Sequence, residues 1–163
     1  MASDAVDKIL AQWQRERPDL DVSPMGTIGR TTRLASYLKK AIGETFSTFE
    51  LNPGEFDVLA TLRRSGHPYQ LSPTELFKSM MVSSGTMTHR IDRLEAAELV
   101  ERVPDPSDRR GTPIRLTDKG FDLIEKAVTA HVENEHRILS ALDASELESL
   151  TQLLRKLLVS LEK

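Results

Sequence analysis

The chain has 163 residues, of which 39% are hydrophobic and 29% are charged, a composition typical of one ordinary globular domain spanning 1–163. With 22 basic and 25 acidic residues, the net charge of -3 provides no overall attraction to nucleic acid. The absence of cysteine excludes disulfides, thiolate metal sites and thiol redox switches. The N-terminus is acidic, and no run approaches the roughly 18 apolar residues of a membrane helix, so we expect a cytoplasmic protein without a signal peptide.

Hydrophobic periodicity predicts two helices before residue 47. The first covers 4–16, where apolar residues including Trp13 recur at helical spacing until Pro18 interrupts the pattern. The segment 19–26 (DLDVSPMG) is typical of a turn. The second helix is longer, and its apolar face is formed by Ile28, Leu34, Ala35, Leu38, Ala41, Ile42 and Phe46.

Two further helix starts share one signature: a capping side chain, a proline in the first turn and a glutamate that can complete a capping box. They are Asn52-Pro53-Glu55 and Ser72-Pro73-Glu75. The helix from Asn52 ends near Gly66, and the helix from Ser72 lasts about two turns. Ser83 can cap another helix whose inward face is Met87, Ile91 and Leu94. Two short helices joined by a tight turn predict a helix-turn-helix.

The outward face of this last helix carries the first candidate binding residues. Its N-terminal N–H groups, beside Ser83 and Ser84, suit a phosphate oxygen. Short polar side chains and one arginine suit the major groove of double-stranded DNA. A solvated surface with no ligand is the alternative. The candidates are Ser83, Ser84, Thr86, Thr88, His89 and Arg93.

A charged hairpin follows the helix-turn-helix. Residues 99–103 (LVERV) and 112–117 (TPIRLT) alternate as strands do, and the turn-forming PDPSDRRG lies between them. Arg109 and Arg110 at this tip suit the minor groove, and Asp108 suits the orientation of an arginine. Basic and acidic residues are equal in number between His89 and Arg115, so DNA binding requires that most acids point elsewhere.

The C-terminal part predicts two more helices, from Thr117 and from the capping pair Asp143 and Glu146. Leu147, Leu150, Leu154, Leu157 and Leu161 of the last helix follow heptad spacing. An ordinary buried face is one interpretation, and pairing with a second copy is the other. The fold class predicted is therefore mainly α with a small β-hairpin wing: a winged helix-turn-helix, dimeric through helices in 4–46 and 118–163, with a DNA-binding lobe at 50–117.

The sequence resembles the MarR family of winged-helix regulators. FELNPGEFDVLATLRRSG, LSPTEL, SSGTMTHRIDRLE and DPSDRRGTPIRLTDKG carry the resemblance. It implies a dimeric regulator on a pseudo-palindromic operator, with Arg110 in the minor groove. Glu98 stands where the family usually has glycine, and a left-handed conformation there costs about 1 kcal/mol.

The extra N-terminal helix is similar to the family branch that responds to urate and related anionic or phenolic ligands. This resemblance implies a repressor released by such a ligand, with Trp13, Asp57 and Arg90 as the ligand-binding candidates. The alternative for Trp13 is a role in helix packing alone.

Other function classes find less support in the sequence. No phosphate loop, nucleophile elbow or HExxH motif is present, so we expect no enzymatic activity and no cofactor. His131 and His136 lie about 140° apart around a helix, which does not suit a shared metal. The remaining alternatives are a metal-responsive regulator and a winged helix used only for protein–protein contact.

Overall fold

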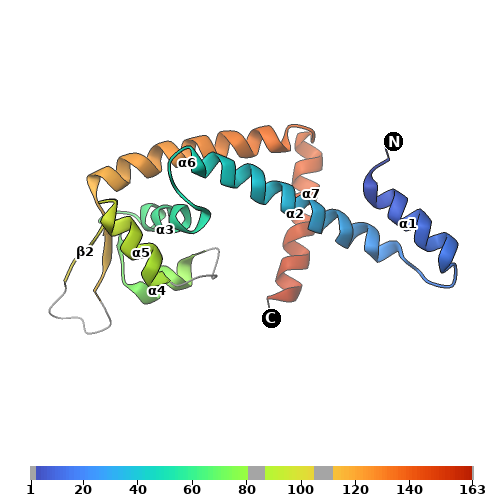
Figure 1. Ribbon diagram of the computed structural model, residues 1–163, viewed down its shortest axis with the longest axis horizontal. Coiled ribbons are helices and arrows are strands. Elements are labelled where there is room, and N and C mark those ends of the chain that lie inside the picture. Colours follow the sequence, from blue (N-terminus) through green and yellow to red (C-terminus); the bar gives the residue numbers. More distant parts are fainter. Residues whose placement is uncertain (1–2, 81–86, 105–111, 163) are drawn as a thin grey trace. The chain divides into compact units, whose positions relative to one another are not determined.

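The computed structural model describes residues 3–80, 87–104 and 112–162 (Figure 1). The chain forms two compact units, whose boundary between Gly43 and Glu44 lies within helix α2 (Ser23–Ser47). Among the described residues, no helix has both the length and the apolar character needed to cross a bilayer.

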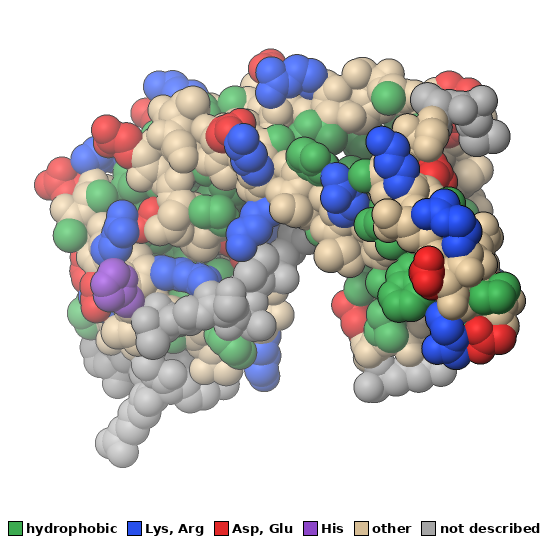
Figure 2. Space-filling view, turned by 45° about the vertical axis from the view of Figure 1, so that its right-hand side comes forward, with side chains coloured by type: hydrophobic (Ala, Val, Ile, Leu, Met, Phe, Trp, Pro, Cys, Tyr) green, Lys and Arg blue, Asp and Glu red, His purple; other side chains and the backbone are tan. Residues whose placement is uncertain are grey.

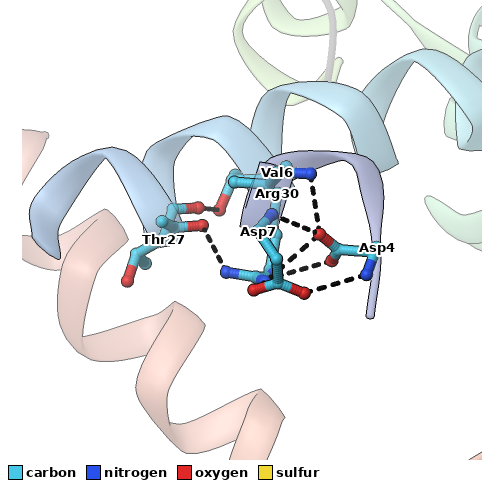
Figure 3. Close-up of polar contacts among 7 residues, drawn as sticks. Asp4, Val6, Asp7, Thr27 and Arg30 are labelled. Atoms are coloured by element: carbon cyan, nitrogen blue, oxygen red, sulfur yellow. Dashed lines mark hydrogen bonds and ion pairs between the residues drawn. The ribbon is translucent and has the colours of Figure 1, made fainter. Parts of the chain in front are cut away.

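The first unit contains α1 (Ala5–Glu16) and most of α2. Asp4 caps α1, and the Asp7 carboxylate accepts a hydrogen bond from the Asp4 N–H at 2.8 Å to complete a capping box. Arg30 of α2 binds both carboxylates, with Nε 2.8 Å from Asp4 and Nη2 2.6 Å from Asp7 (Figure 3). These bonds attach α1 to α2, and Val6 is buried beside Gly29.

Helix α2 begins earlier than the sequence suggests, because the segment predicted to be a turn already contains its first residues. The Asp21 carboxylate accepts a hydrogen bond from the Ser23 N–H at 3.0 Å, which supports the first turn. Pro24 is compatible with this position, since first-turn N–H groups have no partner within the helix. The prediction of a turn is therefore wrong for Ser23 to Gly26.

The second unit carries the remaining helices and a small sheet. Helices α3 (Pro53–Arg64), α4 (Pro73–Ser79) and α5 (Met87–Ala96) lie together beside the sheet, and α6 (Asp118–Leu139) packs on α3 (Figure 1). Helix α7 (Ala144–Leu161) follows α6. The fold is thus mainly helical, as predicted. Its best-buried side chains include Leu59, Leu62, Leu76, Leu94, Ile114 and Ile124.

Capping side chains begin four of these helices where the sequence places them. The Asn52, Ser72 and Asp143 side chains each complete a capping box, with Glu55, Glu75 and Glu146 respectively. The Thr117 hydroxyl accepts a hydrogen bond from the Gly120 N–H at 3.0 Å. These four predictions are confirmed.

The predicted hairpin is part of a three-stranded antiparallel sheet. Strands β2 (Val100–Arg102) and β3 (Ile114–Leu116) pair as expected, with Glu101 opposite Arg115. Strand β1 (Gln70–Leu71) pairs with the other edge of β3 and was not predicted. Two residues are too short for an alternating pattern to be recognised in the sequence.

Candidate nucleic-acid interface

Helix α5 turns one apolar face to the hydrophobic core of the second unit and one polar face to solvent. Ile91 and Leu94 are buried, and Met87 is half-buried, as the sequence predicts. Thr88, His89 and Arg93 are exposed. The other predicted contacts of this region, Ser83, Ser84 and Thr86, lie outside the described residues, as do Asp108, Arg109 and Arg110 of the wing.

Arg93 is fixed by a carboxylate at the start of α3. Its Nε lies 2.9 Å from Oε1 of Glu55, a side chain that is only 3% exposed. The other oxygen of Glu55 accepts a hydrogen bond from the Asn52 N–H at 2.9 Å. The Arg93 side chain is nevertheless 58% exposed, so its remaining N–H groups can reach a ligand.

The acidic residues around α5 have cationic partners. Arg102 of β2 binds Asp92 at 2.6 Å and also contacts Glu95. Lys119 lies 3.5 Å from Glu98, and Arg115 pairs with Glu101. The hydrogen bond with Asp92 raises the pKa of Arg102 above its ordinary value. This guanidinium therefore stays charged and contacts two carboxylates of α5, of which its single charge can offset one.

Arg115 on β3 lies 2.8 Å from Glu101 on β2, across the strand pair. Every acid described between His89 and Arg115 thus lies beside a basic side chain, with Arg102 shared by Asp92 and Glu95. Asp105 and Asp108 lie outside the described residues. Figure 2 shows the same mixing on the viewed face, where blue and red side chains are interspersed. Ion pairing therefore reduces the negative charge next to α5 at short range, as DNA binding requires.

The ligand candidates lie in both units. Trp13 belongs to α1 in the first unit and is 41% exposed. Asp57 of α3 is buried, and its Oδ1 lies 4.0 Å from Nη1 of Arg64. Arg90 of α5 lies against the first turn of α3, where a Cβ added to Gly54 would stand 2.5 Å from its Nε.

Two residues of this region were not recognised as contacts from the sequence. The sequence predicts a capping role for Glu55 and places Arg102 in the strand 99–103. It predicts no ion pair with α5 for either residue. Glu55 and Arg93 are far apart in the sequence, and the capping-box spacing identifies only one of the two oxygens of Glu55. The partners of Arg102 lie 7 and 10 residues before it, across the turn between α5 and β2. Across the parts of the chain that the structure describes, no group of three His, Asp or Glu side chains is arranged to hold a metal ion.

A capped α4, an amphipathic α5 and an antiparallel β2–β3 pair together define a winged helix-turn-helix domain. A model of the MarR family matches residues 51–112. The HTH-type transcriptional regulator PecS of Dickeya dadantii (strain 3937) is 46% identical over 149 residues, covering 91% of this chain and 90% of PecS. The chain therefore belongs to the MarR family, and it is a DNA-binding transcriptional regulator, not an enzyme.

Two solved structures superimpose on the chain. A mutant MarR from Escherichia coli, complexed with operator DNA, is 26% identical with a TM-score of 0.68, covering 96% of this chain and 99% of that one. Bordetella bronchiseptica BpsR, whose DNA binding is regulated by 6-hydroxynicotinic acid, is 27% identical with a TM-score of 0.68. That match covers 80% of this chain and 91% of BpsR.

Proposed function

We propose that two copies of this chain bind a pseudo-palindromic operator in the cytoplasm and repress transcription until a small anionic or phenolic ligand releases them. The observation that carries this proposal is the polar face of α5, where Thr88, His89 and Arg93 are exposed beside acids that are already paired. The E. coli relative complexed with operator DNA supports the choice of double-stranded DNA.

In this proposal, the whole chain 1–163 is one functional domain with a DNA-binding lobe at 50–117. The residues of α5 and of the turn before it enter the major groove: Ser83, Ser84, Thr86, Thr88, His89 and Arg93. Arg109 and Arg110 at the wing enter the minor groove, where the negative potential of DNA is strong, and Asp108 orients one of them.

Dimerisation is assigned to helices within 4–46 and 118–163. None of the described residues of α7 is buried within the chain. Leu154, Leu157 and Leu161 of the heptad row are 49%, 54% and 80% exposed. Such an apolar row needs a cover, and a second copy would also set two recognition helices at the spacing of two operator half-sites.

A mobility-shift assay with the DNA upstream of the protein's own gene tests the DNA-binding role. Wild type should produce a sequence-specific shift, and Arg110→Ala should lose most of it while remaining dimeric. Arg17→Ala is the matched control, because Arg17 pairs with Asp19 outside the 50–117 lobe and should leave the shift intact. If wild type distinguishes no duplex from any other, a protein–protein interaction module becomes the better explanation.

For the effector, we propose a site that includes Trp13, Asp57 and Arg90. BpsR, regulated by an aromatic acid, supports this class of ligand. Trp13 is the single tryptophan of the chain, so quenching of its fluorescence by urate or 6-hydroxynicotinate directly reports binding at α1. The same compounds should release DNA. Absence of both effects would reject these two compounds and this site for them.

A further inference from the structure

We infer that Glu55 is a positioning residue for operator recognition and that it acts through Arg93. The inference rests on the proposed DNA-binding function and assigns a role there to a residue of α3, outside the helix-turn-helix. Glu55 uses its two oxygens differently: one accepts the Asn52 N–H at the start of α3, and the other binds Nε of Arg93 on α5.

Burial gives this ion pair its effect on geometry. At 3% exposure, the Glu55 carboxylate has lost most of its water and depends on Asn52, on the positive N-terminus of α3 and on Arg93 for compensation. The ion pair between Nε of Arg93 and Oε1 of Glu55, at 2.9 Å, therefore restrains the position of Nε. Since a guanidinium is planar, fixing Nε also limits where its exposed N–H groups can point.

The first turn of α3 supports a second arginine of α5. The side chain of Arg90 lies directly on Gly54, where a Cβ would stand 2.5 Å from its Nε and 2.6 Å from its Cζ. Arg90 and Arg93 are three residues apart and so lie on neighbouring positions of one helix face. Glu55 and Gly54 thus hold this face of α5 against α3.

In another capping box of the chain, the two oxygens of one carboxylate likewise have different partners. In α1, one oxygen of Asp7 accepts the Asp4 N–H and the other binds Arg30 of α2 at 2.6 Å (Figure 3). That pair is exposed, with side chains 44% and 43% accessible. The Glu55 pair differs in its burial and in its partner, which is a candidate DNA contact on the recognition helix.

The test compares operator affinity with affinity for unrelated DNA. Glu55→Gln keeps the capping box, since glutamine also suits that position, but removes the charge that holds Arg93. We expect operator affinity to fall about tenfold, in line with the loss of one ion pair that has a buried partner. Affinity for a scrambled duplex of equal length should be unchanged or higher, because one negative charge has been removed near the DNA. A purely structural defect would weaken both.

A double-mutant cycle tests whether Glu55 acts through Arg93. Arg93→Gln should weaken operator binding, and adding Glu55→Gln to it should then have little further effect. Arg93→Lys keeps the charge but lacks the Nε donor, so it should lose operator preference while retaining binding to the scrambled duplex. Because Arg93 is exposed, its substitutions should not disturb folding. The Arg93→Lys variant therefore still tests the inference even if Glu55→Gln folds poorly.

The matched control is Glu146→Gln, which makes the same change in the capping box of the exposed start of α7 and should leave both affinities unchanged. The probe is a duplex selected by wild type from a random-sequence pool. If wild type selects no sequence, the proposed function fails. If wild type selects one and Glu55→Gln and Arg93→Lys retain its full preference, or if the cycle is additive, only the role of Glu55 is overturned.

Discussion

Glu98 adopts a backbone conformation that favours glycine. Its φ is 60°, in the left-handed region, where it ends the turn between α5 and β2. The side chain is 83% exposed, and its contact with Lys119 at 3.5 Å is a surface ion pair of small energetic value. The left-handed conformation expected at Glu98 is therefore confirmed, and the local cost remains in the folded protein.

We predict that Glu98→Gly raises the free energy of unfolding by about 1 kcal/mol, because glycine adopts positive φ without the steric cost of a Cβ. Urea or thermal unfolding followed by circular dichroism measures the change. Glu98→Ala is the control: it removes the same carboxylate but keeps the Cβ, so it should give no such gain. Equal effects of glycine and alanine would contradict the explanation from φ.

At the scale of elements, ion pairs join helices and strands that the chain separates. Arg102 connects β2 to α5 through Asp92 and Glu95, and Arg63 connects α3 to α6 through Glu125 at 2.5 Å. Arg30 connects α2 to α1 through Asp4 and Asp7 (Figure 3). Each arginine thereby fixes the orientation of one element against its neighbour.

The attachment of α1 should weaken in acid. The hydrogen bond from the Asp7 N–H, followed by bonds from Arg30 and Val6, lowers the pKa of Asp4 below its ordinary value of 3.8. A carboxyl with a lowered folded pKa stabilises the folded state above its unfolded pKa, and this contribution disappears as pH falls through the folded value. Attachment should therefore be intact at neutral pH, begin to weaken near the ordinary pKa of Asp4 and be lost as pH falls through its lowered folded pKa.

Asp4→Asn isolates this effect, because asparagine still caps α1 but carries no charge for Arg30. At neutral pH, Trp13 fluorescence should report a lower melting temperature for the variant than for wild type. The difference should shrink as pH falls below the ordinary pKa of Asp4. A difference that does not depend on pH would show that the charge of Asp4 does not hold α1.

At the scale of the whole molecule, the exposed apolar row of α7 is the main feature that one chain leaves unexplained. Six large side chains of this helix are at least 49% exposed: Leu153, Leu154, Leu157, Leu158, Val159 and Leu161. Burying one leucine is worth roughly 2 kcal/mol, and two-fold symmetry buries each residue twice. Assembly through α7 would therefore gain much more than any surface ion pair described above.

We predict that Leu157→Asp weakens dimerisation more than a hundredfold, because a carboxylate would be buried in both copies of the interface. Sedimentation velocity should detect a monomer. Circular dichroism should show unchanged helical content, since Leu157 is 54% exposed within the chain. Operator affinity should fall with dimerisation, because one lobe reaches one half-site only. Gln152→Asp, on another face of α7, is the control, and a dimer that survives Leu157→Asp would place the interface elsewhere.

Much of this fold follows from local chemistry. Asn52, Ser72, Thr117 and Asp143 each bond an N–H two or three residues further along, so the sequence specifies both partners of every cap. The apolar spacing of α5 likewise predicts the buried face with Ile91 and Leu94. Short-range geometry was therefore sufficient to identify a winged helix-turn-helix and to predict which face of α5 is polar and exposed.

Contacts between different secondary-structure elements could be identified only in the folded structure. The pairing of Glu55 with Arg93 spans two helices, and the pairing of Arg102 with Asp92 depends on how β2 returns beside α5. A Cβ on Gly120 would lie 1.9 Å from the Leu99 carbonyl oxygen, a close approach that the sequence around Gly120 does not reveal. Acidic and basic residues are equal in number between His89 and Arg115. Only the folded structure shows which of the described acids lie beside a basic side chain, and Coulomb energy depends on that distance and on local water.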